Sequence, residues 1–243
     1  MLVGTSGYDY DHWESVFYPA GLEKRGRLGF YAARFPTVEI NNTFYHLPSP
    51  RAFDHWRETA PPGFVFALKA SRYITHMKKL KDPAAPLEAF MERAARLGGA
   101  LGPVLFQLPP RWRLNRQRLA LFIDALPSGV DFAFEFRDAS WFDEEVYALL
   151  RSRGLSLCIY HMGEFASPVV ATAPFVYMRL HGPRPAYSGR YGRRGLRPWA
   201  DLAGDFLAEG RDVYVYFNND AGGAAVLDAA ELTAMMGERR KEV

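Results

Sequence analysis

Eight short apolar runs, separated by segments with helical periodicity, constrain the fold of this chain more than any other feature. The runs are rich in β-branched and aromatic residues and span residues 2–5, 38–41, 65–69, 103–108, 132–137, 155–160, 175–181 and 213–218. The amphipathic segments between them include residues 87–97, 117–126, 144–153, 199–209 and 224–236. Strands that alternate with helices predict a parallel sheet with right-handed crossovers. Eight such strands in 243 residues predict an α/β fold of one (β/α)8 TIM-type barrel.

The chain contains no glycine- and serine-rich linker, so we expect a single barrel domain over residues 1–243. The charged residues 238–243 are expected to fray. No run approaches the ~18 apolar residues of a membrane span, and the first residues lack the pattern of an export signal. Cys158 is the single cysteine, which fits a reducing compartment. These observations predict a cytoplasmic protein without a membrane partner, in an oligomeric state that the sequence leaves open.

The charge of the chain is unevenly distributed although its net value is only +3. Residues 69–82 and 111–118 each carry a local net charge of +4, residues 184–197 carry +5, and the rest of the chain sums to −10. Each basic stretch follows a predicted strand and therefore begins at the carboxyl ends of the strands, where barrel enzymes bind their substrates. This segregation predicts an anionic ligand, with phosphate as the favoured group.

Strand parity predicts which polar side chains share the interior face. Alternate residues of a strand face opposite sides, so Tyr177, Arg179 and His181 share a face. Applied to all strands, this rule gathers polar side chains near the strand ends: Glu39, Asn41, Lys69, Gln107, Glu135, Arg137, Arg179, His181 and Asn218. Carboxylates beside an imidazole can act as general acid and base. The alternative is a structural plug of buried ion pairs, which is weak evidence for function.

Two further segments are expected at the same end of the strands. Residues 181–199 are predicted to be a long loop that carries two tyrosines, five arginines and several glycines. Arginines can fork onto phosphate, and tyrosines can stack on rings or close a lid. Residues 218–224 join the last strand to the last helix, where barrels often bind phosphate. Asp220 in this segment either caps the helix or binds a hydroxyl group.

Several motifs in a fixed order identify a resemblance to a known family. They are GTSGY (4–8), TVEINNTFY (37–45), Lys69, TH (75–76), LGPVLFQLPP (101–110), FEFR (134–137), SW (140–141), YMRLHG (177–182), YSGRY (187–191) and YFNND (216–220). They span roughly residues 4–232, and the chain resembles the YecE-like family, domain-of-unknown-function family 72. The resemblance implies a barrel and supplies no established activity. Tyr8 and Asp228 stand where many members of that family have Trp and Asn.

The leading hypothesis is an enzyme that acts on a phosphorylated or otherwise anionic small molecule. Glu39 or Glu135 would act as base and His181 as acid, with Lys69 as the fourth catalytic candidate. The candidate substrate-binding residues are Asn41, Tyr45, Gln107, Arg137, Arg179, Tyr187, Arg190, Tyr191, Arg194, Asn218 and Asp220. The reaction class stays open among hydrolase, isomerase and lyase.

Two other functions compete with this hypothesis. Basic loops with aromatic residues also suit a nucleic-acid-binding protein or nuclease, and a non-catalytic interaction barrel would need the acidic residues only for structure. No cofactor is predicted, because the chain has no nucleotide-binding glycine fingerprint or Walker motif. Glu39, Glu135, His181 and Asp220 form an oxygen–nitrogen set that can bind a divalent metal. The neighbouring cations Lys69, Arg137 and Arg179 oppose it, so no metal ligand is predicted.

Overall fold

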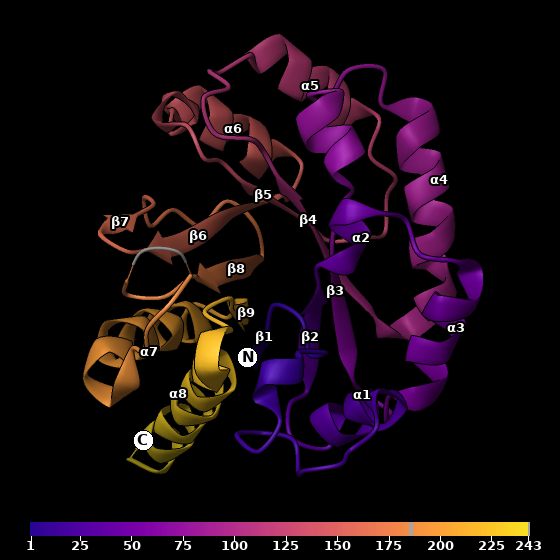
Figure 1. Cartoon of the computed structure of the whole chain (residues 1–243). Coiled ribbons are helices and arrows are strands. Elements are labelled where there is room, and N and C mark those ends of the chain that lie inside the picture. The colour runs from indigo at the N-terminus through magenta and orange to yellow at the C-terminus, as the bar shows by residue number, and fades with distance from the viewer. Residues whose placement is uncertain (185–186, 243) are drawn as a thin grey trace. The chain divides into compact units, whose positions relative to one another are not determined.

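The computed structural model describes residues 1–184 and 187–242, and these residues form nine strands (Figure 1). The strands are β1 (Leu2–Thr5), β2 (Thr37–Ile40), β3 (Val65–Lys69), β4 (Leu101–Gln107), β5 (Phe132–Glu135), β6 (Ser156–Met162), β7 (Phe165–Ala166), β8 (Phe175–Leu180) and β9 (Asp212–Phe217). Their order in the sheet is β1-β9-β8-β6-β5-β4-β3-β2, with the two-residue β7 antiparallel to β6. The ladders β1–β9, β8–β9, β3–β4, β4–β5 and β5–β6 are parallel. The predicted (β/α)8 TIM-type fold is confirmed.

Helices follow the strands in turn. The α-helices are α1 (Lys24–Ala32), α2 (Asn42–Tyr45), α3 (Pro50–Thr59), α4 (Ala84–Ala94), α5 (Arg116–Asp124), α6 (Glu144–Ser152), α7 (Gly192–Ala208) and α8 (Ala224–Glu242). Short helical turns are η1 (Asp11–Trp13), η2 (Tyr73–Met77), η3 (Ala95–Ala100), η4 (Ala139–Trp141) and η5 (Ala221–Gly223). η2 is a π-helix directly after β3, and π-turns are frequent at functional sites. No helix in the described part of the chain has the length and apolar character needed to cross a membrane.

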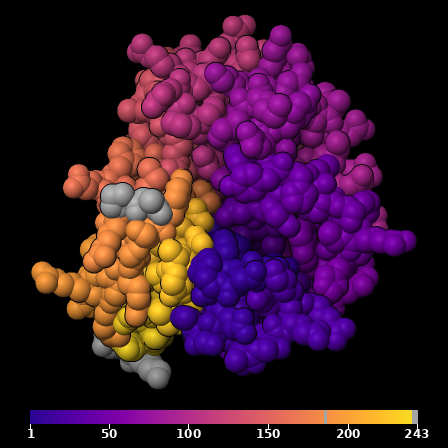
Figure 2. Space-filling model, in the orientation of Figure 1, coloured from indigo at the N-terminus to yellow at the C-terminus, as the bar shows by residue number. Residues whose placement is uncertain are grey.

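The first of two compact units comprises residues 1–39, 159–169 and 174–243. In it β9 pairs with both β1 and β8, and Ser6, just after β1, bridges to Glu39 of β2. Helices α7 and α8 contact each other and β9, and they lie side by side in Figure 1. In Figure 2 the orange atoms of α7 adjoin the yellow atoms of α8. This packing places the carboxyl ends of β1, β8 and β9 close to the starts of both helices.

Helix α7 begins seven residues before the predicted helix at 199, so residues 192–198 are helical and the expectation of a loop over 181–199 was wrong there. Gly192, Gly195 and Pro198 argue locally against a helix. Burial decides the outcome, because Leu196, Ala200, Ala203 and Phe206 form one buried stripe at helical spacing. Tertiary packing of such a stripe supplies more stability than intrinsic propensity.

The second unit comprises residues 40–158 and 170–173. Its core is a cluster of phenylalanines, in which Phe106 contacts Phe122 at 4.9 Å and Phe134 at 5.4 Å between ring centroids. Helices α3 and α4 contact each other and lie side by side in Figure 1. Phe132 and Phe134 both reach Phe106, whereas Glu135 contacts Arg137. The predicted alternation along β5 is therefore confirmed.

Candidate functional site

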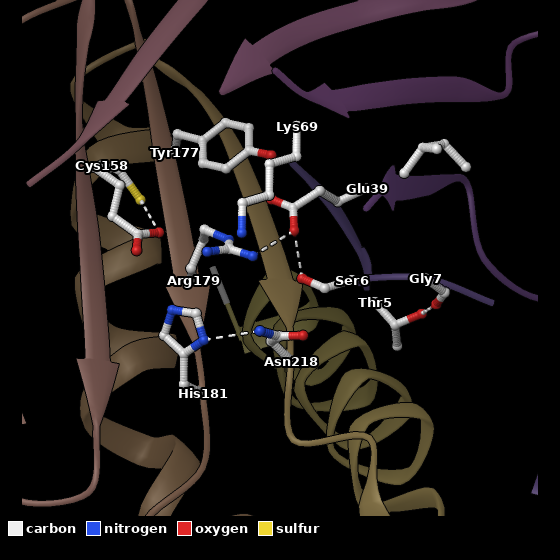
Figure 3. A network of polar contacts seen from close by, with 12 residues as sticks. Thr5, Ser6, Gly7, Glu39, Lys69, Cys158, Tyr177, Arg179, His181 and Asn218 are labelled. Atoms are coloured by element: carbon white, nitrogen blue, oxygen red, sulfur yellow. Dashed lines mark hydrogen bonds and ion pairs between the residues drawn. The ribbon is translucent and has the colours of Figure 1, made fainter. Parts of the chain in front are cut away.

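A buried carboxylate network lies at the carboxyl ends of β1, β2 and β8 in the first unit (Figure 3). The carboxylate of Glu39 accepts hydrogen bonds from the hydroxyls of Ser6 and Tyr177, each at 2.6 Å, and from Nη2 of Arg179 at 2.7 Å. Ser6, Glu39, Tyr177 and Arg179 are all completely buried. Tyr177 and Arg179 reach the same acceptor, which agrees with the shared face predicted from strand parity.

The Glu39 network holds its carboxylate in the charged form. Burial alone would raise the pKa of Glu39, but the guanidinium of Arg179 and the hydrogen bonds from Arg179, Ser6 and Tyr177 together lower it. Three donors already occupy its two oxygens. Glu39 is therefore built to hold Arg179 and the Ser6 hydroxyl in place.

His181 lies one residue beyond β8 and is completely buried. Its Nδ1 lies 3.0 Å from Nδ2 of Asn218, which follows β9 (Figure 3). An amide nitrogen can only donate, so Nδ1 accepts and the proton of the neutral ring is on Nε2. The ring of Tyr187 stands edge-on to His181 at 5.2 Å, and that tyrosine is 41% exposed. This geometry leaves His181 able to donate a proton from Nε2.

Tyr191 fastens the segment that follows His181. Its hydroxyl forms a hydrogen bond with Nδ1 of His161 at 2.7 Å and accepts one from the backbone N–H of Gly182 at 3.1 Å. Burial lowers the pKa of His161, which favours the neutral imidazole. Gly182 has φ +102°, and a Cβ there would meet the backbone of Ser188 at 2.4 Å. The predicted substrate-binding residue Tyr191 thus has a structural role in this arrangement.

Asp228 of α8 is a second anchor and was not among the predicted site residues. This completely buried carboxylate accepts the backbone N–H groups of Tyr191 and Gly192 at 3.0 and 3.2 Å. It also accepts Nε of Arg190 at 3.3 Å and Nδ2 of Asn219 at 2.9 Å. Asp228 therefore caps the start of α7 from another helix, in the manner expected for an anion at a helix N-terminus.

The five arginines of residues 184–197 divide into two groups. Arg190 pairs with Asp228 and Glu231, and Arg193 pairs with Glu238. Arg184, Arg194 and Arg197 are exposed and have no ion pair with any residue that the structure describes. Arg194 and Arg197 lie in the first turns of α7, where positive charge opposes the helix dipole. The two positive charges destabilise the helix at this position, and an anion bound beside them would offset that cost.

Asp220 lies beyond β9 on the side of η1. Its backbone carbonyl accepts Nε1 of Trp13 at 2.8 Å, and Nε2 of His12 lies 3.5 Å from its carboxylate. Burial raises the pKa of Asp220. The contacts show how the segment 218–220 is held against the start of the chain.

Of the predicted residues in the second unit, Lys69 packs against an aromatic cluster. Nζ of Lys69 lies 4.1 Å from the centre of the Phe44 ring, and Thr43 donates to the Lys69 carbonyl at 2.7 Å. His76 of η2, which we did not include among the expected site residues, stands edge-on to Phe44 at 5.0 Å. Tyr45 is 68% exposed. Lys69, Phe44 and His76 therefore come together through the π-helix, a turn that the sequence pattern did not reveal.

Glu135 and Arg137 form a salt bridge at the end of β5, and the thiol of Cys158 lies 3.8 Å from the Glu135 carboxylate. Glu135 and Cys158 are both completely buried. Gln107 ends β4 and Asn41 precedes α2, where Oδ1 of Asn41 is buried without a hydrogen-bond partner in the described structure. The catalytic roles of Glu135 and Lys69 stay predictions.

His76 provides a pH-dependent prediction. Burial, with the positive charges of Lys69 and Arg72, lowers the pKa of His76 to about 4. An unfolded histidine titrates near pH ~6.5, so between these values the unfolded chain binds a proton that the folded chain does not. Stability should therefore fall as the pH drops through this window, by about 1 kcal/mol at pH ~5 after allowance for the solvent-exposed part of the ring.

The variant His76→Gln should remove this part of the pH dependence. Urea unfolding of both proteins at pH ~7 and ~5 measures the change in the free energy of unfolding with pH, to which only groups that titrate contribute. An unchanged difference between the two pH values in the variant would contradict the account.

Glu39, Glu135, His181 and Asp220 were considered above as an oxygen–nitrogen set for a divalent metal. Among the described residues, no group of three or more His, Cys, Asp or Glu side chains has the arrangement needed to hold a metal ion. Within the first unit, Glu39 contacts Arg179, which is the cation that we expected to oppose a metal there.

Comparisons with known proteins place the chain in a family. The profile of the family "Protein of unknown function DUF72" matches residues 2–243. The chain is 25% identical over 270 aligned positions to the UPF0759 protein YunF of Bacillus subtilis, covering 97% of this chain and 94% of that protein. It is 32% identical over 127 positions to the UPF0759 protein YecE of Escherichia coli K12, covering 51% of this chain and 46% of that protein.

Solved structures agree with this assignment. A DUF72 family protein from Thermotoga maritima has a TM-score of 0.88 at 29% identity, covering 97% of this chain and 98% of its own. A second DUF72 family protein, from Enterococcus faecalis V583, has a TM-score of 0.81 at 20% identity, covering 97% and 95%; at that identity the likeness concerns the fold alone. The family resemblance predicted from the motifs is confirmed, and the chain belongs to the DUF72 family of proteins of unknown function.

Proposed function

We propose that this protein is an enzyme that acts on a phosphorylated or otherwise anionic small molecule at the carboxyl ends of β8 and β9. The observation that carries the proposal is His181, a buried imidazole whose Nδ1 lies 3.0 Å from Nδ2 of Asn218, a contact from which we assign the ring proton to Nε2. A buried, oriented imidazole is the commonest general acid–base group in enzymes. Arg184, Arg194 and Arg197, which have no carboxylate partner in the described part of the chain, follow it in the sequence.

In this proposal Arg194 and Arg197 attract the anionic group of the substrate. A guanidinium binds phosphate or carboxylate through two parallel hydrogen bonds. The two charges lie on the first turns of α7, whose N-terminal dipole adds to the attraction. Arg190 has a different role, because its guanidinium is engaged by Asp228 and Glu231.

Glu39 acts in this proposal as an anchor for Arg179. Its two oxygens receive three hydrogen bonds and its pKa is lowered, both of which disfavour proton uptake. His181, with Nε2 as donor, remains the acid of the first unit. Tyr187 stands beside His181 and, in this proposal, its ring covers the bound substrate.

A thermal-shift panel of sugar phosphates, nucleotides, single-stranded oligonucleotides and divalent metals tests the proposal. A small phosphate at ~100 times its Kd adds ~2.7 kcal/mol, which raises the Tm by roughly 5–10 °C for a chain of this size. We expect such a shift with a small phosphate, and we expect Arg194→Ala to reduce it at least by half.

The matched control is Arg25→Ala, which removes an exposed arginine from α1 in the same unit and should leave the shift unchanged. A shift confined to oligonucleotides and erased by salt would favour the nucleic-acid alternative. The absence of any shift would contradict the anion site and favour the structural ion-pair network.

A further inference from the structure

A surface pocket of about 540 Å³ in the second unit is lined by residues of η2, of α4 and of the segments beside them. Its lining residues are Leu47, Ser71, Tyr73, Ile74, Lys78, Asp82, Ala85, Pro86, Ala89 and Phe90. Seven of these ten are apolar or aromatic. Pockets that bind small molecules have volumes of about 300–1,000 Å³ and mostly apolar walls with a few polar groups.

The pocket exists because small residues occupy the facing side of α4. Ala85 and Ala89 are four residues apart and so lie one above the other on the helix. Phe90 and Ile74 are buried and close the base, whereas Tyr73 is 47% exposed and Leu47 is 37% exposed at the edge. The apolar edge thus remains in contact with solvent, which costs free energy unless something covers it.

The backbone at the rim of the pocket is held in an unfavourable conformation. Lys79, Leu80 and Asp82 have φ values of 48°, 62° and 45°, and a non-glycine residue in this region costs roughly 1–2 kcal/mol. Leu80 is buried and anchors the turn. The turn keeps Lys78 of the pocket wall at the end of the π-helix. Strain of this kind concentrates at functional sites and ligand clamps.

The polar groups of the pocket indicate the charge of its ligand. Nζ of Lys78 donates to Asp82 at 3.2 Å, and an ammonium group has two more donors. The Ser71 hydroxyl accepts the backbone N–H of Tyr73 at 3.2 Å and can donate its own proton. Lys78 and Asp82 are the charged lining residues and balance each other, but the surrounding residues 69–82 have a net charge of +4, which favours a negative ligand group over a positive one.

We propose that this pocket binds a small anionic amphiphile, with a flat apolar body between η2 and α4 and one acidic group on Lys78. The flat body would lie against Tyr73 and Ala89, and its carboxylate or other acid would accept hydrogen bonds from Lys78 and Ser71. This inference does not rest on the proposed function, because it uses none of the residues assigned to that function.

Calorimetric titration with 2-naphthoate tests this site, with 2-naphthalenemethanol as a neutral analogue and 2-naphthylmethylammonium as a cationic one. We expect naphthoate to bind saturably and the alcohol to bind with an affinity at least about fivefold lower. The cation should show no saturable binding. Ala89→Trp fills the pocket and should weaken naphthoate at least about tenfold. Lys78→Met should weaken naphthoate about fivefold and leave the alcohol unchanged.

Leu121→Trp is the matched control, because it adds the same side chain at a position of α5 that is 59% exposed and outside the pocket. Naphthoate should bind this variant as it binds the wild type. Ala89 and Lys78 lie at the surface, and equal Tm values establish that the variants are folded. Equal affinity for naphthoate and its alcohol, or unchanged naphthoate binding by Ala89→Trp, would overturn the proposal.

Discussion

Arg179→Met is expected to destabilise the protein by about 3–5 kcal/mol at pH ~7, because it leaves a buried carboxylate without its cation. Among the described side chains, Glu39 would keep only the hydroxyls of Ser6 and Tyr177 as hydrogen-bond donors, in a site with no exposed surface. Urea unfolding monitored by fluorescence measures the loss as a lower midpoint.

The pH dependence of this loss follows from the pKa of Glu39. In the wild type the pKa is lowered, so the stabilisation is present above the ordinary value of 4.5 and is lost as the pH falls through the folded value. In Arg179→Met the effect of burial on Glu39 is no longer offset by the guanidinium, so the neutral form of the Glu39 carboxyl is favoured. The destabilisation should therefore be smaller at pH ~4 than at pH ~7.

Two further variants separate the ion pair from simple loss of volume. Arg27→Met also removes a buried guanidinium, but its partners Asp9 and Asp11 have side chains that are 45% and 70% exposed. Those carboxylates can be rehydrated, so this control should lose only about 1 kcal/mol. The double variant Glu39→Gln/Arg179→Met removes both charges and should be more stable than Arg179→Met alone. A double variant that is less stable than the single one would show that charge is not the cause.

Asp228→Ala is expected to cost about 3 kcal/mol and to loosen the start of α7. The backbone N–H groups of Tyr191 and Gly192 and the side-chain amide of Asn219 lose their acceptor together, and each buried unsatisfied donor costs about 1–3 kcal/mol. Hydrogen exchange at Tyr191 and Gly192 should accelerate at least about tenfold.

Asp228→Asn retains one carbonyl acceptor and should lose about half as much stability as the alanine variant. Asp205→Ala on α7 removes a carboxylate that is 72% exposed and should change stability by less than ~0.5 kcal/mol. If exchange at Tyr191 and Gly192 were equally slow in wild type and Asp228→Ala, Asp228 would not be the anchor of this segment.

The sequence predicts the strands well because burial and β-propensity agree there. The predicted runs 2–5 and 65–69 coincide with β1 and β3, and the other predicted strands overlap the observed ones with end shifts of a few residues. Alternation along β5 and β8 also predicts correctly that Tyr177 and Arg179 share a face, since side-chain direction in a strand depends only on parity.

The helices and turns after the strands are less predictable because contacts distant in sequence determine them. The early start of α7 depends on its buried stripe and on a cap from Asp228, which is 36 residues away from Gly192. The π-helix η2 and the positive φ values that follow it leave no periodic signal. The single-domain assignment, the cytoplasmic location and the frayed tail stay predictions.

The candidate site was predicted as a set of residue types and not as a set of contacts. The positions of polar residues at strand ends identified Glu39, Arg179, His181 and Asn218. Strand parity shows that side chains share a face, but it does not show that Glu39 pairs with Arg179 or that His181 pairs with Asn218. Charge counting also treated the arginines of 184–197 as equal, whereas Arg190 and Arg193 are neutralised by acidic residues of α8. Such pairing appears only when the two helices are packed together.

The most direct test of the central claim is the imidazole signal of His181 in two-bond 1H–15N correlation spectra, with and without the anion selected by the thermal-shift panel. His181→Gln assigns the signal. We expect a neutral ring protonated on Nε2, because Asn218 donates to Nδ1, and we expect its Nε2 resonance to move saturably with the anion. A ring protonated on Nδ1, or a signal that no bound anion moves, would contradict His181 as the acid of an anion-binding active site.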